Sequence, residues 1–160
     1  MEKRIAAYAF IFIAGLSTEF LAFYLIDGAN AFAFHFRFTN WDHLLTDIMP
    51  GMAAVIAAAA LHIPFMRAVR TGRRLPLYGW TLLGVVGAHA AYALLMLFYA
   101  YFFPRFPTHQ SPELFALQTA YFYGVFSLAL GFIPNLLYGI GITEALLWLE
   151  KKLPAPAPAS

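Results

Sequence analysis

Hydrophobic residues along the chain form four long apolar segments separated by shorter polar stretches. The segments cover about residues 5–26, 47–66, 77–103 and 112–149. Each is long enough to cross a hydrocarbon layer of about 30 Å as a helix, which takes about 20 residues. Backbone groups inside a bilayer must be hydrogen-bonded within their own segment, which favours helices. The pattern therefore predicts an all-α integral membrane protein with four transmembrane helices in an antiparallel bundle.

The overall composition excludes a soluble globular protein. Hydrophobic residues make up 62% of the chain and charged residues 11%, whereas soluble domains contain about 45–50% and about 25%. The net charge of +2 does not indicate nucleic-acid binding, because the basic residues flank the apolar segments, where membrane insertion uses them. Since the chain has no cysteine, disulfides, thiolate metal ligands and thiol nucleophiles are excluded as well.

The basic residues are distributed unequally between the two ends of the segments. Eight of the 10 precede the first segment, join the second to the third, or follow the fourth: Lys3, Arg4, Arg67, Arg70, Arg73, Arg74, Lys151 and Lys152. Only Arg37 and Arg105 lie at the opposite ends. The positive-inside rule then places both termini in the cytoplasm. We expect the protein in a bacterial inner membrane.

The fourth segment is too long for one straight crossing, since it would rise about 57 Å as a helix. Ser111 and Pro112 mark its start as an N-cap and a first-turn proline. Pro134 and the glycines that follow it predict a kink or a break near residues 134–141. With a kink, residues 142–152 continue the span, whereas with a break they lie along the inner surface. Residues 1–152 form one transmembrane domain, and the Pro/Ala-rich tail 153–160 is expected to be flexible.

Polar side chains within the predicted spans are the main candidates for function, because ionisable groups are costly there. They are Glu19, His62, His89, Asn135 and Glu144. The rise per residue gives Glu19 and His89 similar depths near the middle of the membrane, and gives His62 and Glu144 similar depths nearer the inner edge. We expect each acid to face its histidine. Such pairs relay protons or form the polar floor of a ligand site, or they only fix helix register.

A second group of polar residues lies at the opposite ends of the segments from the termini. It includes His35, His43, Asp47, His109 and Glu113. Imidazole and carboxylate groups suit zinc or copper, but no three of these residues have a recognised ligand spacing. Helix capping and solvated loops explain the same residues, so we expect no metal site.

No other cofactor is expected. Two histidines on neighbouring spans, His62 and His89, suggest haem b, which takes axial ligands on opposite faces of the iron. Their estimated depths differ by about 10 Å, which disfavours this arrangement.

Small residues on the second and third segments predict a close contact between these two helices. Ala54 and Ala58 on the second, with Gly84 and Ala88 on the third, have the spacing that lets helix backbones approach in membranes.

These features support two hypotheses for the function. The favoured one is a non-enzymatic accessory or ligand-binding helical module within the membrane. The alternative is a small membrane enzyme or proton-coupled carrier that acts on an amphiphile through an intramembrane Glu/His pair, Glu19 and His89. The expected partners are membrane lipids, together with another membrane protein or a second copy of the chain.

Overall fold

The computed structural model describes residues 8–17, 21, 24, 28, 41–103 and 111–152, with side chains omitted for 41–44 and 149–152. Every regular element in these ranges is helical, as the apolar pattern predicts. The elements are an N-terminal helix Tyr8–Ser17, α3 Trp41–Thr71, α4 Arg74–Phe102 and α5 Pro112–Lys152.

Three of these helices, α3, α4 and α5, are long and apolar enough to cross a membrane. All three extend past at least one of their predicted bounds, because helix continues into the flanking polar residues. The N-terminal helix Tyr8–Ser17 is a shorter apolar helix. Apart from Leu21 and Tyr24, the rest of the first predicted span, including Glu19, lies outside the described residues.

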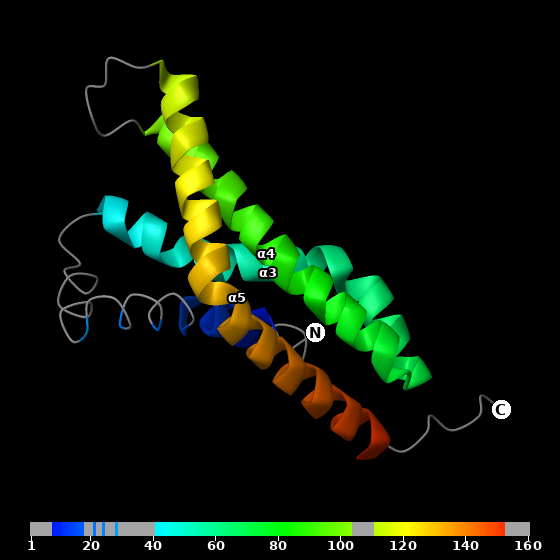
Figure 1. Cartoon of the computed structure of the whole chain (residues 1–160). Helices are drawn as coiled ribbons and strands as arrows, with labels where there is room; N and C mark the ends of the chain where they lie inside the picture. Colours follow the sequence, from blue (N-terminus) through cyan, green and yellow to red (C-terminus); the bar gives the residue numbers. More distant parts are fainter. Residues whose placement is uncertain are drawn as a thin grey trace.

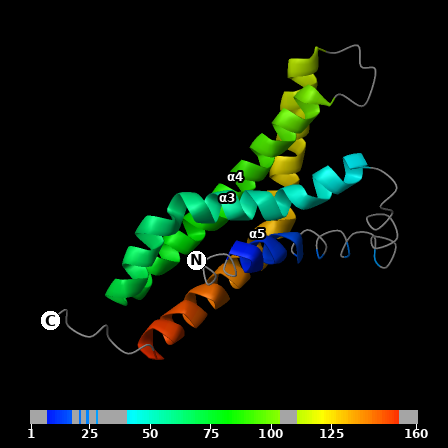
Figure 2. The ribbon, with the colours of Figure 1, turned by 180° about the vertical axis from the view of Figure 1, so that it is seen from behind.

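The central helix of the assembly is α4, which packs along both α3 and α5, while α3 and α5 make few contacts with each other. Figures 1 and 2 show the end of α4 close to the start of α5, while the first part of α3 runs obliquely to both and its second part runs beside α4. The N-terminal helix packs on α3, since a Cβ added to Gly15 would lie 2.9 Å from the Pro50 carbonyl oxygen. Two glycine positions, Gly15 and Gly51, thus allow the close approach of these two helices.

A tight turn joins α3 to α4. Gly72 adopts a φ of +64°, which L side chains rarely adopt, and its amide donates to the Val69 carbonyl at 3.0 Å. Thr71 Oγ1 donates to the Ala68 carbonyl at 2.8 Å, so the last carbonyls of α3 are satisfied locally. The turn makes α3 and α4 an antiparallel pair.

The last helix, α5, begins with the predicted cap, because Ser111 Oγ accepts the Leu114 amide hydrogen at 3.3 Å. It contains 41 residues, and the helix continues without interruption through Gly139 and Gly141. The helix nevertheless changes direction partway along in both views (Figures 1 and 2). Pro134 lies inside it and lacks the amide hydrogen that would bond to the preceding turn, which is the usual cause of such a bend.

Three glycines of α5 form the closest contact with α4. A Cβ added to Gly124 would lie 3.0 Å from Ala93 Cβ, and one added to Gly131 would lie 3.1 Å from His89 Cε1. At Gly139 the nearest atom is Thr81 Cγ2, at 2.7 Å. Any larger side chain at these positions would push the two helices apart.

Candidate functional site

A cavity of about 430 Å³ lies between the N-terminal helix, α3, α4 and α5. Most of its lining is apolar, and the polar or charged side chains at its wall are few: Tyr8, His62, Arg70, Trp80, Thr81, Asn135, Tyr138 and Thr143. Ligand sites in proteins are commonly cavities of about 300–1,000 Å³ with this mixture of an apolar wall and a few polar groups. The cavity is therefore the candidate functional site.

Small residues of α3 and α4 form part of the wall of this cavity. Ala54, Ala58, Gly84 and Ala88, which we expected to form the closest helix contact, all line the cavity. The nearest atom to a Cβ added at Gly84 is Leu61 Cδ1, at 3.8 Å, an ordinary contact distance. Helices α3 and α4 do pack along each other, as expected, and these four residues also border the cavity. A Cβ added at Gly87 would likewise lie in contact with α3, 3.6 Å from Ala57 Cβ.

His62 presents an imidazole to the cavity from α3. Its ring centroid lies 6.1 Å from that of Tyr8 on the N-terminal helix, with the rings tilted by 39°. Among the described residues no side chain or backbone group is hydrogen-bonded to either ring nitrogen. His62 is thus placed to hydrogen-bond a group within the cavity.

Arg70, on the last turn of α3, lines the same cavity at the end nearest the α3–α4 turn. It follows His62 by about two helical turns, a rise of about 12 Å. The guanidinium adds up to five N–H donors to a wall that is otherwise poor in polar groups.

His89 lies in a second, smaller cavity of about 70 Å³ between α3, α4 and α5, which Gly15 of the N-terminal helix also lines. The Asn135 amide nitrogen lies 3.5 Å from His89 Nε2, and His89 Nδ1 lies 3.1 Å from Ser127 Oγ. With the amide nitrogen as donor, Nε2 accepts and the Nδ1 hydrogen is donated to Ser127. The Ser127 hydroxyl in turn donates to the Gly124 carbonyl at 3.0 Å. Both ring nitrogens are engaged, so this network ties α4 to α5.

Asn135 belongs to the walls of both cavities, as do Gly15, Ala54 and Ala88. The two spaces therefore adjoin, and Asn135 is the polar side chain at the boundary. Tyr92 and Tyr123, which complete the smaller cavity, are in edge-to-face contact with centroids 6.4 Å apart.

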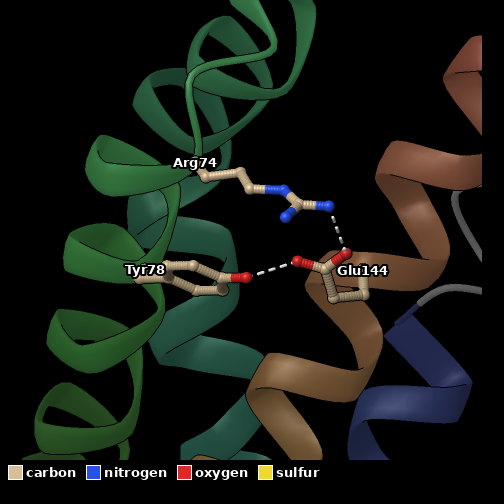
Figure 3. Close-up of polar contacts among 3 residues, drawn as sticks. All are labelled: Arg74, Tyr78 and Glu144. Carbon is tan, nitrogen blue, oxygen red and sulfur yellow. Dashed lines mark hydrogen bonds and ion pairs between the residues drawn. The ribbon is translucent and has the colours of Figure 1, made fainter.

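Glu144 is bound by two side chains of α4 (Figure 3). Tyr78 donates its phenolic hydrogen to Glu144 Oε1, and the Arg74 guanidinium lies 3.5 Å from Glu144 Oε2. One residue earlier on α5, Thr143 Oγ1 lies 2.8 Å from Thr81 Oγ1, with one hydroxyl donating to the other. These contacts hold the N-terminal half of α4 against the C-terminal half of α5. Glu144 itself does not line the cavity.

The structure brings two of the five intramembrane candidates together, His89 and Asn135. Within the described part of the chain, His62 and Glu144 share no hydrogen bond, since Glu144 faces α4. The proposed partner of His89, Glu19, lies outside that part. Of the outer residues, His35 and His109 are also outside it, and the His43 side chain is not described. Among described residues no group of three or more metal-ligating side chains gathers near Asp47, Glu113 or elsewhere.

Sequence analysis missed Ser127, Tyr78 and the pair Thr81 and Thr143. A usable signal was present, because Gly124, Gly131 and Gly139 recur at intervals of seven and eight residues. That repeat marks the face of α5 that packs on another helix, and all four missed residues lie along the same contact.

A more open groove of about 740 Å³ runs between the N-terminal helix and α5. Its wall is apolar apart from Tyr138, and it shares Ile11, Tyr138, Ile142 and Leu146 with the central cavity. The two spaces thus have a common wall on the side of the N-terminal helix.

The chain as a whole matches no protein-family model, no curated protein and no solved structure.

Proposed function

We propose that this protein is a non-enzymatic helical module that binds a small amphiphilic molecule within the membrane. The observation that carries the proposal is the cavity of about 430 Å³, with its apolar wall and its few polar groups. An amphiphile matches such a wall, because its hydrocarbon part removes apolar surface from contact with water or lipid while its polar part hydrogen-bonds.

We further propose that the chain crosses the membrane four times with both termini in the cytoplasm. The support is the excess of basic residues at one end of the apolar segments. In this orientation Arg70 and the α3–α4 turn are cytoplasmic, and the cavity occupies the inner half of the bilayer. The groove along α5 gives a lipid-dissolved molecule a lateral approach to it.

The hydrogen bonds of His89 favour binding over proton transfer. The alternative function requires His89 to exchange a proton with a carboxylate. His89 is held by a hydroxyl and an amide, neither of which titrates near neutral pH. Its interactions instead match those of a polar group that fixes helix register.

Trp80 offers a direct test, because it lines the cavity. The Trp41→Phe/Trp148→Phe variant retains Trp80 as the single tryptophan. In phosphatidylcholine nanodiscs, a spin-labelled fatty alcohol at low mole fraction should quench Trp80 fluorescence with a saturable component. Quenching that rises only linearly with probe, as for a tryptophan in contact with bulk lipid, would refute the proposal.

Two neighbouring alanines of α3 supply a matched control. Ala58 lines the cavity, whereas the adjacent Ala59 is exposed and outside it. In the single-tryptophan background, Ala58→Phe should fill the cavity and abolish saturable quenching, and Ala59→Phe should leave it unchanged. If both variants bind the probe as the parent does, the probe occupies some other site.

A further inference from the structure

We infer that the ligand is a single-chain amphiphile with an anionic oxygen head group, a carboxylate or a phosphate, that is bound by Arg70 at the end of the cavity, with His62 further along its wall. This inference rests on the proposed function and names the class of ligand that the cavity takes. The hydrocarbon chain then extends away from the α3–α4 turn, toward Asn135.

The charge of the cavity wall carries the first step. Among the described residues that line the cavity, Arg70 is the one with a full charge, and no carboxylate is present. Arg70 forms no ion pair with any residue in the described ranges. An unneutralised guanidinium at the end of an apolar cavity attracts an anion and disfavours a cation.

The nearby Arg74 differs from Arg70 in that its charge is neutralised. Arg74 begins α4 on the other side of the turn, and its guanidinium pairs with Glu144, which also accepts the Tyr78 hydroxyl hydrogen (Figure 3). Glu144 follows the cavity-lining Thr143 directly, yet its carboxylate is directed to α4. Within the described part of the chain, Glu144 is thus bound by α4 and leaves Arg70 available.

The positions of the polar groups give the orientation. Arg70 lies on the last turn of α3, and His62 lies about 12 Å further along the helix. A head group with several acceptor oxygens suits the donors of a guanidinium and an imidazole. Beyond His62 the wall is formed by small and apolar side chains such as Ala58, Gly84 and Val85, which suit hydrocarbon.

The volume of the cavity favours one chain. About 430 Å³ lies in the lower part of the range of about 300–1,000 Å³ that is typical of sites for small ligands. A lipid with two long chains would extend beyond such a space.

The test compares three spin-labelled probes with one chain length and different heads: a carboxylate, an alcohol and a trimethylammonium. Quenching of the single Trp80 in phosphatidylcholine nanodiscs gives an apparent affinity for each probe. We expect the carboxylate to bind about tenfold more tightly than the ammonium, the effect of one charge-assisted hydrogen bond. Arg70→Gln should remove this preference, and Arg70→Lys should retain part of it.

Arg73→Gln is the matched control, since Arg73 is exposed beside the same turn and outside the cavity wall. Unchanged selectivity in Arg73→Gln combined with its loss in Arg70→Gln supports the inference. Equal effects of the two substitutions, or equal binding of all three heads by the parent, would overturn it while leaving the proposed function intact. If no probe quenches with saturation, the proposed function itself fails.

Discussion

The closest contact between α4 and α5 makes a sharp prediction for two glycines that lie two residues apart. A Cβ added at Gly139 would lie 2.7 Å from Thr81 Cγ2 and 3.7 Å from Val85 Cγ2. Around Gly141, in contrast, no described atom beyond the local backbone of α5 and the two adjacent residues lies within 4 Å of an added Cβ. Gly139→Ala should therefore destabilise the protein relative to Gly141→Ala.

The magnitude follows from two opposing effects. Replacing a helical glycine by alanine stabilises a helix by roughly 0.5–1 kcal/mol, and this gain is common to both sites. At Gly139 the methyl group must displace a side chain whose hydroxyl is fixed by Thr143, at 2.8 Å, and by the Leu77 carbonyl, at 2.9 Å. Overpacking of this kind costs about 1–3 kcal/mol. The two variants should differ by about that amount, which corresponds to roughly 2–12 °C in Tm for a chain of this size.

Thermal unfolding of both variants in the same detergent measures the difference. Thr81→Ser removes Cγ2 and keeps the hydroxyl, so adding it to Gly139→Ala should recover most of the lost stability. A double-mutant cycle then isolates the contact between positions 139 and 81. If Gly139→Ala unfolds at the same temperature as Gly141→Ala, or above it, the described packing of α5 on α4 is wrong.

Three further predictions concern topology and the polar groups. A cysteine at Thr108 should react with an impermeant maleimide on intact cells and a cysteine at Thr71 only after lysis; the reverse pattern would invert the proposed orientation. His89→Phe should lower the free energy of unfolding by about 1–3 kcal/mol, because it removes the hydrogen bonds of His89 to Ser127 and Asn135. His62→Phe, which breaks no described hydrogen bond, should cost less than half as much in the same denaturation assay, and equal losses would contradict the roles assigned to the two rings. Glu144→Gln should change Tm little, since the amide oxygen still accepts the Tyr78 hydroxyl hydrogen and an exposed ion pair contributes weakly to stability. A large fall in Tm would show that the charge of Glu144 is itself required.

The helices were predictable because their causes are local. Apolar length defines α3, α4 and α5, and the start of α5 follows from a serine whose side chain caps the first turn. The change of direction of α5 likewise has a local cause, a proline within a helix that is too long for a straight crossing.

The cavity and the polar pairs were harder to predict, because they depend on how each helix is rotated about its axis. The depths estimated from the sequence placed His62 and Glu144 at similar levels in the membrane. In the structure, however, Glu144 faces Tyr78 and Arg74 on α4. Small residues such as Gly84 predicted the approach of α3 and α4, but they did not predict that the same residues would border a cavity. Asn135 was identified as a candidate, but its partner was not.

The position of α4 between α3 and α5 has a consequence for biogenesis. Since α3 and α5 make few contacts with each other, neither can find its final place until α4 has entered the bilayer. The ribosome delivers α3 and α4 before α5, and their tight turn allows this hairpin to form while α5 is still being synthesised. The last helix, α5, then packs on α4, and its three glycines form the contact that completes the assembly of the helices.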